Sequence, residues 1–422
     1  MTTQERIFNK TFNPGDDDGM FNACVGENGF VDKQTYSIGF AEAVDILTSA
    51  LEAMDERANL DTLIYPICFC ARHHVELFLK AQIDQIAGMR GLTPKLPGKQ
   101  GASVSSTHDL GNLWTVFASL AVATDRRYIQ HVAEIEEFVQ DIAQIDPTGQ
   151  TFRYPTDTES VKHLIATPVI NVLSLRRRFK ALVSKIEAIE LLSDALSHEY
   201  RHGSHTTKLS RADLQYIALN LPLYETWARS DDVVKAKARI MQMFAISSND
   251  FNRAAAVIKG HPEFAPNIGL YVPIAGLDRG VIDNFSRILS DELSVQAWST
   301  DEMGTIEAIY EIARADHLSE EFQSVQQHLK REFAFERYTQ GQLGHRARSI
   351  PRFLAGLQKL GQLDLAEYAR HSLDASNLLN RLKRENEEFA RRHPNIGMSL
   401  VRDQIKASSS TESEPSCDAG KT

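Results

Sequence analysis

The sequence has few cysteines, and none of them lie at a spacing typical of a metal site. The four are Cys24, Cys68, Cys70 and Cys417, and no CxxC pair occurs among them. Four cysteines are too few to staple 422 residues with disulfides. We therefore expect a chain that works in a reducing compartment and holds no metal.

Long hydrophobic runs and cofactor-binding motifs are absent too. No stretch of about 18 uncharged apolar residues is present to cross a bilayer. The amino-terminal residues lack the apolar core of a signal peptide. A GxGxxG after a strand, a GxxxxGK[ST] phosphate loop and a GxSxG elbow are all missing. These absences predict a cytoplasmic protein with no membrane partner and no cofactor.

Basic residues are fewer than acidic ones, and the formal net charge is −10. A general nucleic-acid coat needs a positive surface that releases counterions from phosphates, so this class is disfavoured, although a local basic patch stays open. What the chain does have is 42% hydrophobic residues, enough to bury a core. Its 422 residues are long for one core, and two domains are expected.

Apolar residues recur at the three-and-four spacing of amphipathic helices through most of the chain, which predicts an all-α fold. We expect an extended segment over 1–35, a helical bundle over 36–229, a second helical domain over 230–407 and a disordered polar tail over 408–422. Ser106 or Thr107 is expected to cap one helix of the bundle. Pro168 is expected near the start of the long helix that runs to about Leu196. The helices are expected at 36–54, 63–87, 110–120, 129–145, 160–196, 210–227, 234–244, 250–258, 280–289, 303–315, 319–331, 350–360 and 363–386.

The first group of candidate functional residues lies beside the apolar stripe of the second helix. It comprises Arg72, His73, His74 and Glu76. Buried polar groups without partners cost about 1 to 3 kcal/mol each, so these groups are either solvated or part of a network. One interpretation is a substrate-binding surface formed by Arg72, His73 and Glu76. The other is an Arg72–Glu76 pair within the helix, with solvated histidines.

The second candidate is Arg153, which lies between two aromatic residues after the turn Asp146-Pro147-Thr148-Gly149. A guanidinium flanked by rings can stack on a base or hold a phosphate with its planar fork. Arg153 can equally tie the loop to Asp157 or Glu159.

The third group is the stretch from His198 to His205, which contains three histidines, one arginine and one carboxylate. Imidazole exchanges protons near neutral pH, and guanidinium stabilises charge on a phosphoryl group. Arg201, His202 and His205 are therefore the candidate catalytic residues for metal-free RNA cleavage. Zinc binding is the rival use, but zinc needs three or four converging ligands and HExxH is absent. The stretch can also be a polar connection between two helices, in which Gly203 ends the first of them.

Two segments resemble bacterial proteins of the HEPN-like helical class, including members found among defence genes. They are Cys70-Ala71-Arg72-His73-His74-Val75-Glu76-Leu77-Phe78-Leu79-Lys80, and Asp146-Pro147 through Phe152-Arg153-Tyr154-Pro155. A third segment, His108-Asp109-Leu110 followed by Leu113-Trp114, lies between them and is part of the same resemblance. The resemblance covers about residues 36–227. It implies a helical bundle that dimerises and, in active members, a metal-independent ribonuclease with one composite site of arginine and histidine.

In that class the RNA 2′-hydroxyl attacks the adjacent phosphate, histidine handles the protons and arginine stabilises the transition state. The leading hypothesis is thus an endoribonuclease or RNA-binding effector, a toxin of a bacterial stress or phage-defence system, acting as a homodimer. Its second domain is expected to sense a trigger or hold a protein partner. Arg201 and His205 stand closer in sequence than the pair usually does, with three residues between them. This favours the alternative, a non-catalytic interaction or scaffold protein with a HEPN-like fold.

The ribonuclease hypothesis requires that residues distant in the chain meet in space. We expect Arg72, Arg153, Arg201 and His205 to gather in one groove.

Overall fold

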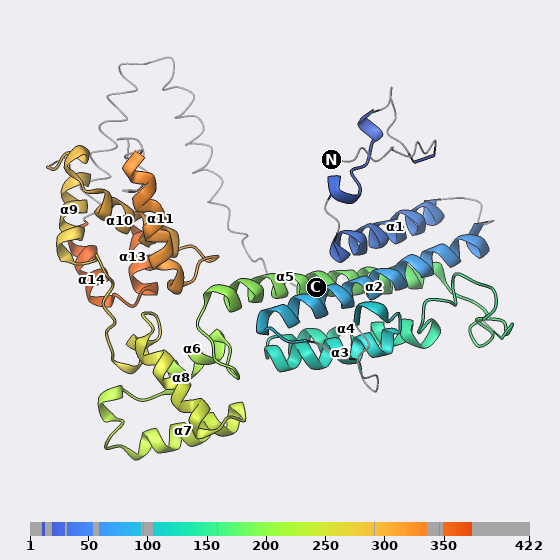
Figure 1. The fold of residues 1–422 in the computed structure, drawn as a ribbon, viewed down its shortest axis with the longest axis horizontal. Helices are drawn as coiled ribbons and strands as arrows, with labels where there is room; N and C mark the ends of the chain where they lie inside the picture. The colour runs from blue at the N-terminus through green and yellow to red at the C-terminus, as the bar shows by residue number, and fades with distance from the viewer. Residues whose placement is uncertain are drawn as a thin grey trace, which may run out of the picture. The chain divides into compact units, whose positions relative to one another are not determined.

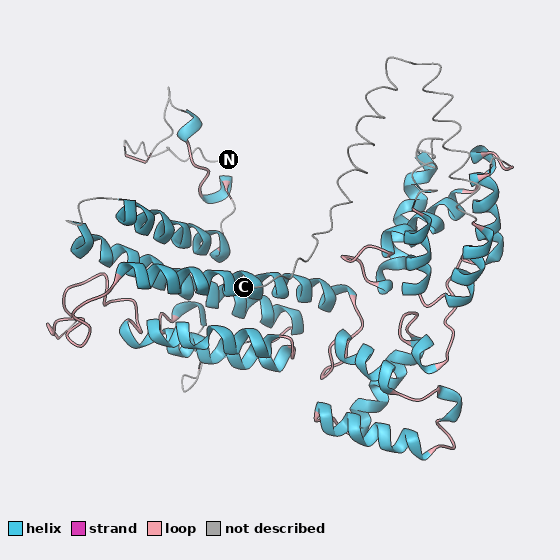
Figure 2. Cartoon of the chain, turned by 180° about the vertical axis from the view of Figure 1, so that it is seen from behind, coloured by secondary structure: helices cyan, strands magenta, loops and turns pink. Residues whose placement is uncertain are grey.

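The computed structural model describes residues 11–12, 19–29, 32–53, 59–93, 96, 104–157, 159–290, 292–335, 346 and 349–373. The described residues form thirteen α-helices and short 3-10 turns, with one isolated bridge between Thr156 and Lys162 and no strand (Figures 1 and 2). This confirms the all-α class. Among these residues, no helix combines the length and apolar composition needed to cross a bilayer.

The chain divides into two compact units, Met1–Arg201 and His202–Thr422. The sequence suggested a boundary between residues 229 and 230, whereas this division falls after Arg201. The reason is that Leu214 and Ile217 pack with apolar residues of the helices that follow them. The expected disordered tail lies outside the described residues.

The first unit is built around two long helices. Its helices are α1 (Lys33–Ala53), α2 (Leu60–Arg90), α3 (Leu110–Thr124), α4 (Tyr128–Ile145) and α5 (Val172–His202). One apolar cluster joins α2 to α1 and α5, and a larger one joins α2 to α3, α4 and α5. Figure 1 shows α2 and α5 lying side by side between α1 on one side and α3 with α4 on the other. Since α2 has buried residues on more than one face, it is the central helix of this unit.

Local signals set the ends of these helices. Gly91, with a φ of 61°, ends α2 in the left-handed conformation that glycine favours. The side chain of Asp109 caps α3 by accepting a hydrogen bond from Asn112 N (2.9 Å). The prediction that Ser106 or Thr107 caps this helix is therefore wrong. α5 begins at Val172, and Pro168 therefore precedes the helix.

The second unit has two apolar clusters. One joins α6 (Arg211–Asn220), α7 (Asp231–Phe244) and α8 (Ser248–Gly260). The other joins α9 (Arg279–Leu289), α10 (Thr300–Ile312), α13 (Ile350–Lys359) and α14 (Leu363–Ser372), and includes Phe322, the first residue of α11 (Phe322–Phe335). Residues 262–277 are irregular apart from the 3-10 turn Ala265–Ile268.

Candidate functional site

A buried carboxylate on α2 organises the polar centre of the first unit. The Glu76 side chain is 2% exposed, and its Oε1 accepts hydrogen bonds from Lys80 Nζ (2.8 Å) and His108 Nδ1 (2.7 Å). Its Oε2 accepts from Arg72 Nη1, and His73 Nδ1 lies 3.9 Å away. Burial acts to raise the pKa of Glu76, but the nearby His73 imidazole and hydrogen bonds from Lys80, Arg72 and His108 together hold it well below its usual range. Glu76 is therefore ionised at neutral pH.

Arg72 joins this carboxylate to two loops. Its Nε donates to the carbonyl oxygen of Asp146 (3.0 Å), and its Nη2 donates to those of His108 (2.5 Å) and Pro147 (3.2 Å). The Arg72 side chain is 2% exposed. Its guanidinium thus holds the start of α3 against the turn after α4, and it does not reach a surface where a substrate could bind. The predicted pair of Arg72 with Glu76 is confirmed.

The turn after α4 is shaped around this guanidinium. Gly149 has a φ of 81°, and a Cβ there would lie 3.1 Å from Arg72 Cζ. Asp146 is fully buried; its Oδ1 accepts from Thr151 N (3.1 Å), and its Oδ2 lies 3.7 Å from Arg72 Nε. Glycine is required here by both the backbone conformation and the close approach of Arg72.

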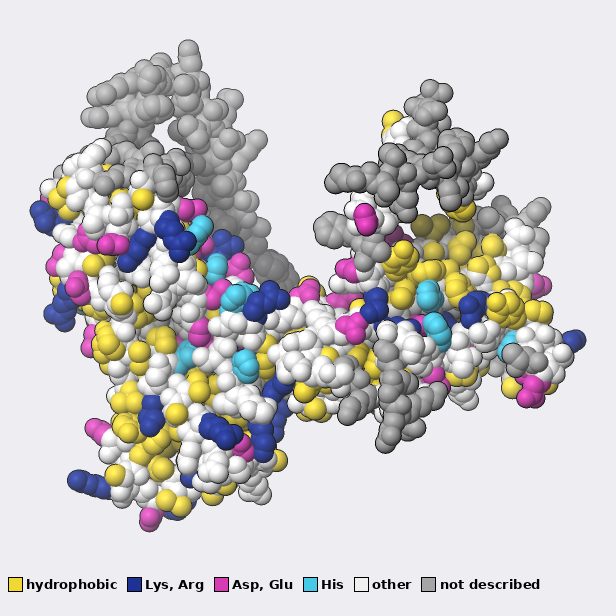
Figure 3. All heavy atoms as spheres, in the orientation of Figure 1, with side chains coloured by type: hydrophobic (Ala, Val, Ile, Leu, Met, Phe, Trp, Pro, Cys, Tyr) yellow, Lys and Arg dark blue, Asp and Glu magenta, His cyan; other side chains and the backbone are white. Residues whose placement is uncertain are grey.

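Three side chains at the edge of this network are open to solvent. The His108 side chain is 65% exposed and the His73 side chain 28%, and Arg153 is exposed. The His73 ring stacks on Phe69 with centroids 5.6 Å apart and an interplanar angle of 12°. Figure 3 shows histidine and basic side chains gathered beside a broad hydrophobic area over α1 and α2.

The backbone and two rings hold Arg153 in place. Its Nε donates to the carbonyl oxygen of Gly149 (2.5 Å), and its Cζ lies 6.0 Å from the Phe69 ring centroid and 5.7 Å from that of Tyr154. Arg153 thus has two aromatic neighbours, but one of them is Phe69 and not the adjacent Phe152 that the sequence indicates, and its hydrogen bond goes to Gly149 and not to Asp157 or Glu159. Phe69 therefore contacts both His73 and Arg153.

Arg201 lies elsewhere in the first unit. The adjacent Tyr200 accepts a hydrogen bond from Arg90 Nη2 (2.9 Å) and donates to the carbonyl oxygen of Thr124 (2.8 Å), at the far end of α2. From Arg72 to Arg90, α2 rises about 27 Å at about 1.5 Å per residue. The expectation that one groove collects all four residues therefore fails for Arg201.

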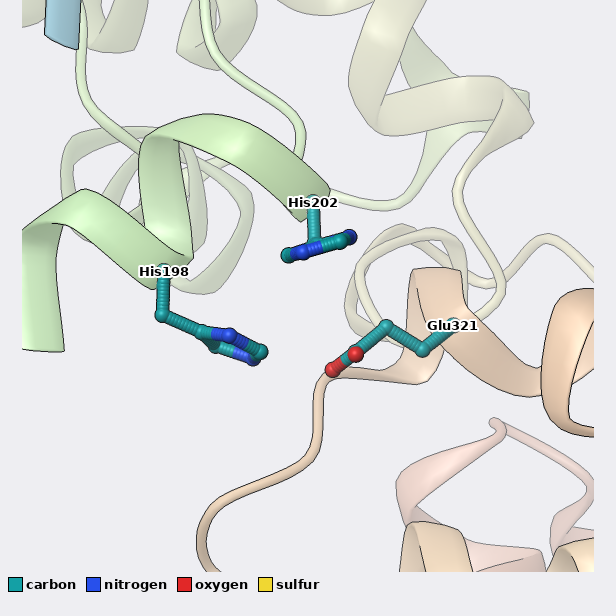
Figure 4. A group of neighbouring side chains, drawn as sticks. All are labelled: His198, His202 and Glu321. Atoms are coloured by element: carbon teal, nitrogen blue, oxygen red, sulfur yellow. The ribbon is translucent and has the colours of Figure 1, made fainter. Parts of the chain in front are cut away.

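The histidines near the end of α5 lie on either side of the division between the units. Figure 4 shows His198 and His202 one turn apart on α5, with Glu321 in the same view. Within the second unit, a ring nitrogen of His202 and a carboxylate oxygen of Glu321 lie within 4.8 Å of each other. Zinc prefers three or four ligands, and the second unit supplies two of them here. His205 is exposed in the connection after the helix, where its Nδ1 lies 3.3 Å from the carbonyl oxygen of Gly203.

Sequence reasoning did not include His108, Lys80 or Asp146 among the candidate site residues. His108 and Asp146 lie in the segments that carry the resemblance, and Lys80 stands one helical turn after Glu76. No local pattern shows that His108 meets Glu76, because 32 residues separate them.

Comparison with known proteins adds no relative. No protein-family model matches the chain, and neither a search of curated proteins nor one of solved structures finds a match.

Proposed function

We propose that the first unit binds RNA and cleaves it without a metal, at the surface formed by His73, His108 and Arg153. The observation that carries this proposal is the hydrogen bond of 2.7 Å between His108 Nδ1 and the buried Glu76 carboxylate. A carboxylate accepts only, so Nδ1 carries the proton, and Nε2 of the neutral ring is a base on an exposed side chain. This is the carboxylate–imidazole arrangement that orients a general base.

The reaction would follow from these positions. His108 Nε2 takes the proton of an RNA 2′-hydroxyl, and the resulting oxygen attacks the adjacent phosphorus. The bond from phosphorus to the 5′-oxygen breaks, and that oxygen takes a proton from the imidazolium form of His73. The products are a 2′,3′-cyclic phosphate and a free 5′-hydroxyl. Arg153 stabilises the charge on the phosphorane oxygens.

The resemblance to HEPN-like proteins supports the wider part of this proposal. It suggests a homodimer that acts as an RNA-targeting effector, or toxin, in bacterial stress or phage defence. The second unit would then sense the trigger or hold a protein partner. A solution mass of one chain at micromolar concentration would contradict the dimer and leave the chemistry of His108 untouched.

The test compares single alanine variants on a labelled RNA in the presence of EDTA. We expect His108→Ala and Arg153→Ala to lose about 10²- to 10⁴-fold in cleavage rate, the usual contribution of a positioned proton-transfer group. His131→Ala, on α4, and Arg177→Ala, exposed on α5, are the matched controls and should retain the rate. No cleavage by the wild-type protein, or full cleavage by His108→Ala, would refute the proposal.

The same assay decides where the site lies. Arg201, His202 and His205 remain the alternative catalytic set that the sequence suggests. If the double variant Arg201→Ala, His205→Ala abolishes cleavage while His108→Ala does not, the site lies at the end of α5.

A second candidate function is that of a non-catalytic interaction or scaffold protein. The burial of Arg72 and Glu76, both 2% exposed, favours it, because their charges then serve to hold the bundle together. The net charge of −10 points the same way. On this reading, labelled RNA is neither cut nor retained at about 0.15 M salt, and alanine at His108 changes neither result.

A further inference from the structure

The first unit contains an apolar cavity that the proposed chemistry does not use. It has a volume of about 350 Å³ and lies between α2, α4, α5, Phe152 and residues 167–171. Cys68 and Ala71 line it from α2, Ile142 from α4, and Phe179 and Leu182 from α5. Small-molecule sites in proteins are concavities of about 300 to 1,000 Å³ with mainly apolar walls. The cavity falls within that range.

The outer wall is formed by Phe152 and by residues of the segment 167–171. Thr167 N donates to the carbonyl oxygen of Leu164 (3.1 Å), and Asn171 Oδ1 accepts a hydrogen bond from Ser174 N (2.9 Å). Hydrogen bonds therefore hold both ends of the segment 167–171.

The mouth of the cavity exposes an aliphatic side chain. Val169 lines the cavity and is nevertheless 83% exposed. Removing such apolar surface from water is favourable. A ligand seated here would cover it.

Charge at the rim indicates what kind of molecule fits. Arg178 is the cationic residue of the lining, and its guanidinium already contacts two carboxylates, Asp141 (2.7 Å) and Glu137 (3.1 Å). One cation beside two anions disfavours an anionic head group. The Cys68 thiol inside is neutral, because burial, with the charge of Asp146, raises its pKa to about 12. Asn171 and Ser174, at the start of α5, are uncharged hydrogen-bonding residues of the lining.

We propose that this cavity binds a small, uncharged, apolar molecule that carries one or two hydrogen-bonding groups. At about 30 Å³ for each atom of the size of a water molecule, the space holds roughly twelve non-hydrogen atoms. A medium-chain alcohol or amide, or a compact aromatic amine, has this size and chemistry. The site is independent of RNA cleavage.

The experiment uses the full chain and the fluorescence of 1-naphthylamine, an uncharged aromatic amine of eleven non-hydrogen atoms. We expect saturable binding, and displacement by 1-decanol at a concentration at least tenfold lower than that needed for decanoate at pH 8. Ala71→Trp, which fills the cavity, should weaken probe binding at least tenfold. Val169→Lys, at the exposed mouth, should weaken it about fivefold, and this variant carries the test where Ala71→Trp does not fold.

Leu191→Lys is the matched control, because Leu191 is an exposed aliphatic residue of α5 (71%) that does not line the cavity. Its probe affinity should stay within twofold of the wild-type value. Absence of saturable binding, equal displacement by decanoate, or equal loss in Leu191→Lys would overturn the proposal. So would sedimentation showing a dimer that Val169→Lys dissociates while the probe does not bind, since the patch would then serve a second copy of the chain.

Discussion

Replacing Arg72 by methionine separates a structural role from a role in binding. The substitution keeps much of the side-chain volume but removes every hydrogen bond of the guanidinium. Three backbone carbonyl groups then lose their Arg72 donor, those of His108, Asp146 and Pro147. Glu76 stays buried, with Lys80 and His108 as its remaining close partners.

The size of the effect follows from burial. Removing one partner of a buried ion pair costs about 3 to 5 kcal/mol. Each orphaned buried acceptor costs about 1 to 3 kcal/mol, but Pro147 also accepts from Leu110 N (3.0 Å), so the terms do not add in full. We take about 3 to 5 kcal/mol as the loss. At about 2 to 4 °C per kcal/mol for a unit of this size, Tm falls by roughly 6 to 20 °C.

The assay is thermal unfolding followed by far-ultraviolet circular dichroism, with calorimetry to resolve the transitions of the two units. Arg153→Met is the matched control, because Arg153 is exposed and makes one hydrogen bond to the backbone. Its Tm should change by no more than the equivalent of about 0.5 kcal/mol. Equal Tm values for Arg72→Met and the wild-type protein would refute the account of Arg72 as a clamp between two loops.

Other predictions concern groups in both units. Burial and two neighbouring acidic residues raise the pKa of Glu190 to about 7, so the native state binds this proton more tightly than the unfolded chain does. Stability therefore falls as pH rises from about 4.5 to 7. Glu190→Gln should raise the free energy of unfolding by up to about 3 kcal/mol more at pH 8 than at pH 5, which thermal unfolding would record as a larger rise in Tm at pH 8. Gly149→Ala should lower the stability of the first unit by about 1 to 3 kcal/mol in chemical denaturation, since it combines a φ of 81° with a contact against Arg72. In the second unit, Arg211→Met leaves two carboxylates without their guanidinium and should cost about 3 to 5 kcal/mol, whereas Arg253→Met, at a side chain that is 68% exposed, should cost less than about 0.5 kcal/mol. Equal melting curves for that pair of arginine variants would contradict the difference in burial.

The sequence predicted the helices well where an apolar stripe faces a neighbouring helix. The stripe of α2 from Leu63 to Ile83 is one example, and α4 ends at Ile145 as expected. It failed over residues 160–171, where Val161 and Ile165 have helical spacing but are exposed. Periodicity records where apolar residues stand, not whether another element covers them. The start of α5 therefore could not be predicted.

For the site, local chemistry was predictable and its long-range partners were not. The pairing of Arg72 with Glu76 follows from their spacing on one helix. The contacts from Arg72 to His108 and Pro147 join residues 36 and 75 positions apart. A single sequence does not show which distant residues meet in the fold. The expectation that Arg201 lies in one groove with Arg72 and Arg153 failed for the same reason. Residue types alone do not show how far apart the side chains lie in the fold.

The three segments that carry the resemblance to HEPN-like proteins meet around one guanidinium. Arg72 comes from the first, His108 from the second, and Asp146 and Pro147 from the third, and Arg72 bonds all of them. These hydrogen bonds give the residues of the resemblance a structural role. A resemblance in sequence alone cannot tell a structural role from a catalytic one. The clamp nevertheless fixes the positions from which His108 and Arg153 reach solvent. A variant that opens the clamp should therefore lose stability and the proposed activity together, whereas His108→Ala should lose the proposed activity with a smaller fall in Tm than Arg72→Met.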